Sequence, residues 1–244
     1  VDGERGGEFS SNRLPGKETR ILANFNGKMK NVTTLAHELG HAYHGDCIFK
    51  EHIFNSSYTM PVAETASIFC ETIVSNAVMK NASAHELKGL LESELADQGQ
   101  TVVDIYSRFL FESELFERRK DASVQVAQLK DMMLRAQKEA YGDGLDHDFL
   151  HPYMWVNKPH YYYSGNNFYN FPYTFGLLFA KGLYAIYQQR GDAFIAQYDE
   201  LLQATGKNSI ADAAKIVNID VRDVAFWRDS LKLIEKNIET FVTL

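Results

Sequence analysis

The sequence predicts a mainly helical protein with a small β element near the start of the chain. Apolar residues recur at intervals of three and four through most of residues 31–244, which is typical of amphipathic helices. The strand candidates lie within residues 1–30. Hydrophobic residues make up 45% of the 244-residue chain and charged residues 23%, which is a globular composition. We therefore expect one domain over residues 1–244, with the β element in 1–30 and helices in 31–244.

Charge and composition exclude several classes of protein. Lys and Arg number 25 against 32 Asp and Glu, so the net charge is −7, and we expect no nucleic-acid partner. No run of 18 apolar residues occurs, so we expect no membrane span and no membrane partner. Two cysteines, Cys47 and Cys70, favour a reducing, cytoplasmic location. The chain begins with Val1 and shows no signal-peptide pattern, so we expect it to be part of a longer protein.

Local signals divide the chain into elements. Residues 20–25 favour a strand, and residues 8–12 are its candidate partner across a turn at 14–17. Asn31 is the expected N-cap of a first helix that ends near His44, with Gly45 just past that end. Further helices are expected near residues 61–80, 84–119 (with a bend at 98–99), 123–141, 173–190, 193–205, 209–217 and 221–242.

The strongest chemical signal is the pentapeptide His37-Glu38-Leu39-Gly40-His41 in the first expected helix. Four residues advance a helix by about one turn, so His37 and His41 share a face and can bind one divalent metal ion. Glu38, next to His37, is placed to act as a general base on water. Two surface histidines at a chance spacing are the alternative. The surrounding helix is apolar nearly all round, so we expect all three side chains to be buried, which favours metal binding.

A third metal ligand is expected on the helix that begins near Pro61. Glu64 and Glu71 are seven residues apart and share one face of an apolar helix. Glu64 lies in the first turn, where the helix dipole favours a carboxylate, and we assign it as the ligand. Glu71 is expected to hold a ligand imidazole by its other nitrogen, and the alternative is a solvated surface charge.

An aromatic stretch at residues 158–173 is a second candidate for chemistry. It contains His160 and five tyrosines around Gly165, in a segment that can move and close on a substrate. Tyrosine hydroxyl and histidine N–H groups can donate hydrogen bonds to the oxyanion of a hydrolysed carbonyl. Packing of aromatic rings is the alternative for most of these residues.

Four segments follow one another in the chain: Ile21-Leu-Ala-Asn-Phe-Asn-Gly27, Thr34-Leu-Ala-His-Glu-Leu-Gly-His-Ala-Tyr-His44, Pro61-Val-Ala-Glu-Thr-Ala-Ser67, and His160 with Phe168-Tyr169 and Tyr173. In this order they resemble the oligoendopeptidase F family, which belongs with thimet oligopeptidase and neurolysin among zinc metallopeptidases. The resemblance implies a mainly helical, zincin-type catalytic domain. It also implies a protein about twice this length, whose N-terminal half would pack against this chain.

The resemblance implies one Zn²⁺ ion per chain, held by His37, His41 and Glu64. It implies that Glu38 is the general base of the reaction. Substrates would be short, unstructured oligopeptides that enter a deep channel.

The family also uses a loop histidine and loop tyrosines to stabilise the oxyanion. His160 matches that histidine. Tyr169 and Tyr173 are the expected tyrosines, and Tyr163 is an alternative.

We therefore expect a zinc-dependent endopeptidase that cuts internal bonds of short peptides. The exposed edge of the strand at 21–25 would pair with the substrate backbone. One alternative is a zinc exopeptidase with the same metal core. The other is a peptide-binding fragment with a structural metal, although structural zinc normally has four protein ligands and only three good candidates are found.

Overall fold

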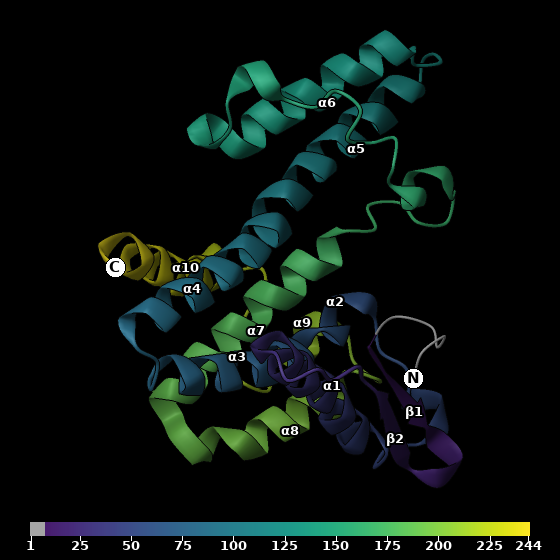
Figure 1. The fold of residues 1–244 in the computed structure, drawn as a ribbon. Coiled ribbons are helices and arrows are strands. Elements are labelled where there is room, and N and C mark those ends of the chain that lie inside the picture. Colours follow the sequence, from purple (N-terminus) through teal and green to yellow (C-terminus); the bar gives the residue numbers. More distant parts are fainter. Residues whose placement is uncertain (1–7) are drawn as a thin grey trace. The chain divides into compact units, whose positions relative to one another are not determined.

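The computed structural model describes residues 8–244 and shows helices along most of that length (Figure 1). The expected mainly helical fold with a small N-terminal β element is confirmed. The described residues form two compact units. One runs to Glu92 and resumes at Phe175, and the other comprises Ser93–Thr174. The single catalytic domain expected over residues 1–244 stays a prediction.

The β element is a two-stranded antiparallel hairpin. Strand β1 (Phe9–Arg13) pairs with β2 (Glu18–Leu22), with Phe9 opposite Leu22 and Arg13 opposite Glu18. The turn between them contains Pro15 and ends at Lys17, whose φ of 47° lies in the left-handed region. The second strand ends three residues earlier than expected, at Leu22.

Helix α1 (Met29–Ile48) begins and ends differently from the expected helix. Asn31 is not the N-cap, because the helix already starts at Met29 and Lys28 precedes it. The Asn31 side chain instead accepts hydrogen bonds from the backbone N–H groups of Asn26 (3.0 Å) and Lys28 (3.2 Å). Asn31 therefore stabilises the start of the helix from inside its first turn.

Gly45 is not a helix terminator, because α1 continues through it to Ile48. A Cβ atom at Gly45 would lie 2.5 Å from Asn12 Oδ1 and 2.9 Å from Thr19 Oγ1. These two side chains face each other across the hairpin, and the Thr19 hydroxyl donates to Asn12 at 2.7 Å. The glycine thus lets the hairpin pack closely against α1.

The second expected helix is divided into α2 (Met60–Ala63) and α3 (Thr65–Met79). The break falls at Glu64, whose backbone (φ −87°, ψ 0°) leaves the helical region. Pro61 lies in the first turn of α2, as expected, where its missing N–H costs no helical hydrogen bond. The break matters because Glu64 is the expected third metal ligand.

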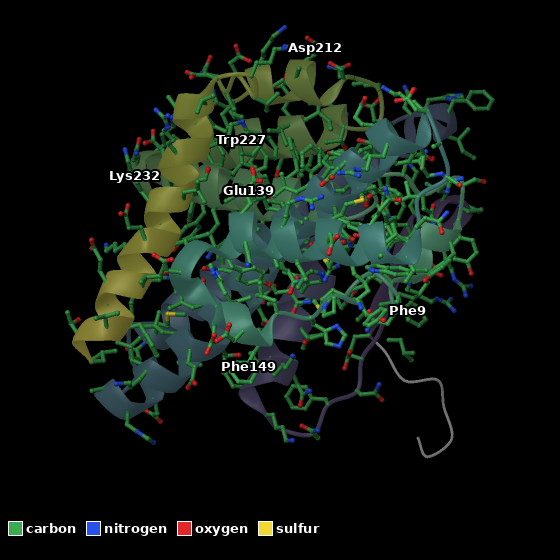
Figure 2. All side chains as sticks on the ribbon, turned by 90° about the horizontal axis from the view of Figure 1, so that it is seen from above. Phe9, Glu139, Phe149, Asp212, Trp227 and Lys232 are labelled. Atoms are coloured by element: carbon green, nitrogen blue, oxygen red, sulfur yellow. The ribbon has the colours of Figure 1, made fainter. Side chains whose placement is uncertain are left out.

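The first unit buries its core between α3 and the helices that follow residue 175. These are the later part of α7 (Phe171–Arg190), α8 (Ile195–Ala204), α9 (Ile210–Lys215) and α10 (Val224–Thr243). Trp227, labelled in Figure 2, packs on Phe175 and Phe226 at ring distances of 5.1 and 5.0 Å. Fully buried members of this core include Ala66, Phe179, Leu183, Leu201, Leu202 and Val217.

The second unit is built mainly from two helices that pack against each other, α5 (Ile105–Arg119) and α6 (Val126–Tyr141) (Figure 1). Helix α4 (Ala84–Gly99) leads into α5 through a wider π-type turn at Gln100–Asp104, just after the expected bend. The core of this unit contains Phe111, Met132, Met133 and Ala136. Among the described residues, we find no helix long and apolar enough to cross a membrane.

Candidate metal centre and aromatic loop

The expected metal ligands lie where the backbones of α1 and α3 approach each other closely. A Cβ atom at Gly40 would clash with the carbonyl oxygen of Ala66 and lie 2.5 Å from the Cα of Ser67. Only glycine therefore allows the two helix backbones to meet at this point. His37 and His41 flank Gly40 along α1, and Glu64 directly precedes α3.

The side chains of His37, His41 and Glu64 converge in this region. One ligand atom from each lies within 4.8 Å of the others, which makes them a candidate metal centre within residues 8–244. Glu64 Oε2 is 3.2 Å from His37 Nε2 and 3.5 Å from His41 Nε2. The structure thus brings together the two histidines and the glutamate that the sequence analysis singled out.

Two neighbouring side chains orient this group. The other nitrogen of His37, Nδ1, is 3.3 Å from Glu71 Oε2. The buried Ser67 hydroxyl donates to Glu64 Oε2 at 3.0 Å. Each bond restricts the rotation of one side chain. A carboxylate at Nδ1 favours a proton on that nitrogen, so a neutral His37 would offer the lone pair of Nε2 to a metal ion.

Burial and charge compete at the three donors. Burial lowers the pKa of His37, but hydrogen bonds to Glu64 and Glu71 outweigh it and raise that pKa to about 9. Burial keeps the pKa of His41 below its usual value, although the charge of Glu64 acts in the opposite direction. Burial would raise the pKa of Glu64, yet its bond to His37 and the two imidazole charges hold it below the usual range. The pKa of each of these side chains therefore depends on the charge of its neighbours.

Glu38 is buried beside this group, with 5% of its surface exposed. Its Oε2 has no hydrogen-bond partner within the described part of the chain. Burial raises the pKa of Glu38, which makes its carboxylate a stronger base, and the charge of His37 opposes this effect.

The expected burial of both histidines was only partly right. His37 and His41 keep 27% and 21% of their side chains exposed. Both face a cleft of about 350 Å³ that also holds Glu38 and Glu64. The opposite face of α1 is also not buried, since Leu39 is 52% exposed. An apolar pattern all round a helix thus did not imply burial all round.

The cleft has lining residues that sequence reasoning missed. Tyr58 lies in it and stacks at 4.0 Å on the buried ring of His44. Glu8 and Phe9 from the start of the hairpin also line it. Tyr58 and Glu8 lie at no spacing that points to the metal motif, so no sequence signal could have found them.

The hairpin strand at the cleft is not the expected one. Phe9, Ser10 and Asn12, which line the cleft, belong to β1, and the lining includes no residue of β2. Part of the expected strand, Ala23 to Phe25, also lies outside the sheet. The hydrophobic pattern identified the hairpin but could not tell which strand faces the metal centre.

The aromatic stretch forms a group of its own in the second unit. The ring of Tyr169 stacks on His160 at 5.5 Å, and its hydroxyl is 3.1 Å from the hydroxyl of Tyr173. His160 Nε2 is buried and, among residues 8–244, makes no hydrogen bond. Burial lowers the pKa of His160, assisted by the charges of Arg108 and Lys158, so the ring is neutral near pH 7. The structure thus brings His160, Tyr169 and Tyr173 together, while their role as oxyanion donors stays a prediction. Tyr163, the alternative, is 62% exposed.

A mainly helical fold with His37, His41, Glu38 and Glu64 in one cleft defines a candidate metal-dependent hydrolase. The sequence pattern described as peptidase family M3 matches residues 2–233, and the chain belongs to this family. It is 26% identical over 241 residues to an oligoendopeptidase F homolog of Borreliella burgdorferi, covering 97% of this chain and 40% of that protein. It is 23% identical over 240 residues to oligopeptidase PepF of Bacillus subtilis, covering 97% of this chain and 35% of that protein.

Solved structures share the fold. A crystal structure from Chlamydophila abortus matches with a TM-score of 0.87 at 24% identity and covers 98% of this chain and 40% of that one. The oligoendopeptidase F of Enterococcus faecium matches with a TM-score of 0.74 at 22% identity. The match covers 88% of this chain and 39% of that one. The resemblance to oligoendopeptidase F is therefore confirmed. The chain spans 40% or less of the length of the two curated relatives described above.

Proposed function

We propose that this chain is the catalytic part of a zinc-dependent endopeptidase that hydrolyses internal bonds of short, unstructured peptides. The observation that carries the proposal is the convergence of His37, His41 and Glu64 in a cleft that also holds the buried Glu38 carboxylate. Membership of peptidase family M3 supports peptides as the substrate class. A cytoplasmic location belongs to the same proposal, as does a further, N-terminal part that packs against this chain. The greater length of the relatives supports the existence of this N-terminal part.

The donor group fits a zinc ion. Zinc–nitrogen and zinc–oxygen bonds of about 2.0–2.1 Å in a tetrahedron place neighbouring ligand atoms about 3.3 Å apart. The spacings of 3.2 and 3.5 Å from Glu64 Oε2 to the two histidines agree with this value. His37, His41 and Glu64 would hold the ion with three protein ligands, whereas structural zinc normally has four, so this ligand set supports a catalytic zinc.

When bound, zinc supplies Lewis acidity, which makes water more acidic and a carbonyl carbon more electrophilic. Glu38 takes a proton from the attacking water and later delivers it to the leaving amine. Its burial supports this role, because a carboxylate held out of solvent binds a proton more readily. Glu71 keeps His37 in the orientation needed for a ligand through the bond to Nδ1.

The oxyanion donors are proposed to be His160, Tyr169 and Tyr173. The N–H of a neutral histidine and the hydroxyl of a tyrosine can each donate a hydrogen bond to a developing negative charge. The stacking of Tyr169 on His160 and the contact between the two tyrosine hydroxyls support a joint action of these groups.

The substrate backbone is proposed to run along β1. This strand lines the cleft, and its outer edge has backbone groups that can pair with an extended peptide. Backbone pairing positions a scissile carbonyl without reading side chains, which supports broad specificity for short peptides.

The direct test is cleavage of an internally quenched peptide of about ten residues by this chain, with chelator and with zinc added back. Cleavage that the chelator stops and zinc restores is the expected result. Mass analysis of the products separates the alternatives, because an exopeptidase releases single residues and an endopeptidase releases two shorter peptides.

A peptide-binding chain without turnover is the second candidate, favoured by the fraction of the relatives' length that the chain spans. Peptide binding without cleavage, even when the remaining part of the natural protein is supplied, would support that candidate.

A further inference from the structure

Helix α5 carries a buried carboxylate that the proposed reaction does not use. Glu112 is 6% exposed and lies between Phe109 and Phe116 along the helix, three and four residues away. Side chains at these spacings share one face of a helix. A carboxylate in such an apolar stripe loses hydration and requires a hydrogen-bond partner in return.

The partner of Glu112 is a backbone group in the aromatic stretch at residues 158–173, which we call the aromatic loop. The N–H of Phe168 donates to Glu112 Oε1 at 2.7 Å. Phe168 has φ of 52°, in the left-handed region, which is strained for a residue with a bulky side chain. Its ring packs 5.5 Å from both Phe109 and Phe116. One face of α5 thus holds this residue by its backbone and by its ring.

The strained residue directly precedes a proposed oxyanion donor. Tyr169 follows Phe168, stacks on His160 and meets the hydroxyl of Tyr173. The left-handed backbone at Phe168 sets the direction in which the chain enters Tyr169. Without an anchor, Phe168 would relax toward a more favourable backbone conformation and turn Tyr169 away from its two partners.

We propose that Glu112 is a positioning residue that holds Tyr169 in its working orientation by fixing the backbone of Phe168. The positioning role rests on the proposed function of Tyr169. The anchoring of the Phe168 backbone by Glu112 does not depend on that function. Glu112 acts from within α5 and makes no contact with substrate in this scheme.

The anchoring is tested by amide hydrogen exchange at Phe168 in the 244-residue chain, which requires no activity. Glu112→Ala removes the acceptor, so exchange at this amide should accelerate by about ten- to a hundredfold. Glu112→Gln keeps an acceptor oxygen at the same position and should retain most of the protection. Glu117→Ala is the matched control, because this carboxylate lies on the same helix with 71% of its side chain exposed. Unchanged protection in Glu112→Ala would overturn the proposal.

The positioning is tested by peptide cleavage with the zinc-loaded chain at a temperature where all variants are folded. Glu112→Ala should lower kcat about tenfold or more with little change in KM, and Glu112→Gln should restore most of it. Normal kcat in Glu112→Ala, under conditions where Tyr169→Phe is impaired, would also overturn the proposal. If Tyr169→Phe turns over normally, the proposed role of Tyr169 fails instead, and the exchange result alone decides whether Glu112 anchors the loop.

Discussion

Glu38 has two properties that support a role as general base. It is buried next to the proposed metal ligands, and one of its carboxylate oxygens has no hydrogen-bond partner among the residues that the structure describes. We predict that Glu38→Gln keeps zinc but lowers kcat by about a hundredfold or more, because the amide cannot accept the proton of water. Zinc content and peptide cleavage measured on the same preparation check this, with the exposed Glu92→Gln as control. Substantial turnover in Glu38→Gln would exclude Glu38 as the base.

Tyr169 tests whether the aromatic loop takes part in chemistry or only in packing. Tyr169→Phe keeps the ring that stacks on His160 and removes only the hydroxyl. We predict a lower kcat with a smaller change in KM, because an oxyanion donor acts mainly in the transition state. Tyr162→Phe is the control, since that hydroxyl donates to the carbonyl of Val156 at 3.0 Å instead. Equal kcat values for the wild type and Tyr169→Phe would leave Tyr169 a packing residue.

The buried imidazole of His44 makes the stability of the fold depend on pH. It is fully buried, its Nε2 is 2.8 Å from the Thr205 hydroxyl, and burial lowers its pKa to about 4. The unfolded chain has the usual value of about 6.5, so below that pH the unfolded state binds more protons than the folded state. The contribution of neutral His44 to the free energy of unfolding is therefore fully present above about pH 6.5. Roughly 3 kcal/mol of this free energy is lost as the pH falls to about 4.

Urea unfolding of the metal-free chain at several pH values measures this effect. His44→Asn removes the titrating group, so its stability should vary less between pH 7 and 5, although the variant is less stable at pH 7. Equal pH slopes in wild type and variant would show that His44 titrates normally in the folded state.

At the scale of elements, the close approach of α1 and α3 positions the three proposed metal ligands. We predict that Gly40→Ala lowers both thermal stability and zinc affinity, because its Cβ would force the two helices apart at Ala66 and Ser67. Gly89→Ala in α4 is the matched control, since nothing lies within 4 Å of its added Cβ. Helix propensity alone should make that variant about 0.5–1 kcal/mol more stable. Thermal unfolding and zinc titration of both variants check the prediction, which fails if Gly40→Ala binds zinc as tightly as the wild type.

The helices were predictable from the sequence, but several of their ends were not, for identifiable reasons. Local periodicity and Pro61 marked the helices, because these signals act within a few residues. The prediction that Gly45 follows the helix end was wrong. The glycine leaves space for Asn12 and Thr19 of the hairpin, and this tertiary contact cannot be seen in the local sequence. The helix break at Glu64 was also missed, since the segment has no helix-breaking residue after Pro61.

In the candidate site, too, residues set by local spacing were predictable, whereas one that depends on contacts between distant segments was not. His37, Glu38 and His41 were predictable because one helical turn fixes their spacing. Glu112 was missed, although a carboxylate within an apolar helix stripe is a signal that could have drawn attention to it.

At the scale of the whole molecule, the two groups of proposed site residues belong to different compact units. The metal donors lie in the unit that ends at Glu92 and resumes at Phe175, and the aromatic loop lies within Ser93–Thr174. Both groups were predictable from the sequence. The aromatic residues lie in one short segment, and the proposed metal ligands come from two helices that follow each other in the chain. Membership of peptidase family M3 spans both units, since the match covers residues 2–233.

Zinc binding by the metal-free chain tests the central claim most directly. The account predicts one zinc ion per chain, measured by titration calorimetry and metal analysis, with a higher melting temperature when zinc is bound. His37→Asn and Glu64→Gln should each weaken binding strongly, because each removes one of three donors. A chain that binds no zinc, or that binds it equally well without His37 and Glu64, would contradict the account.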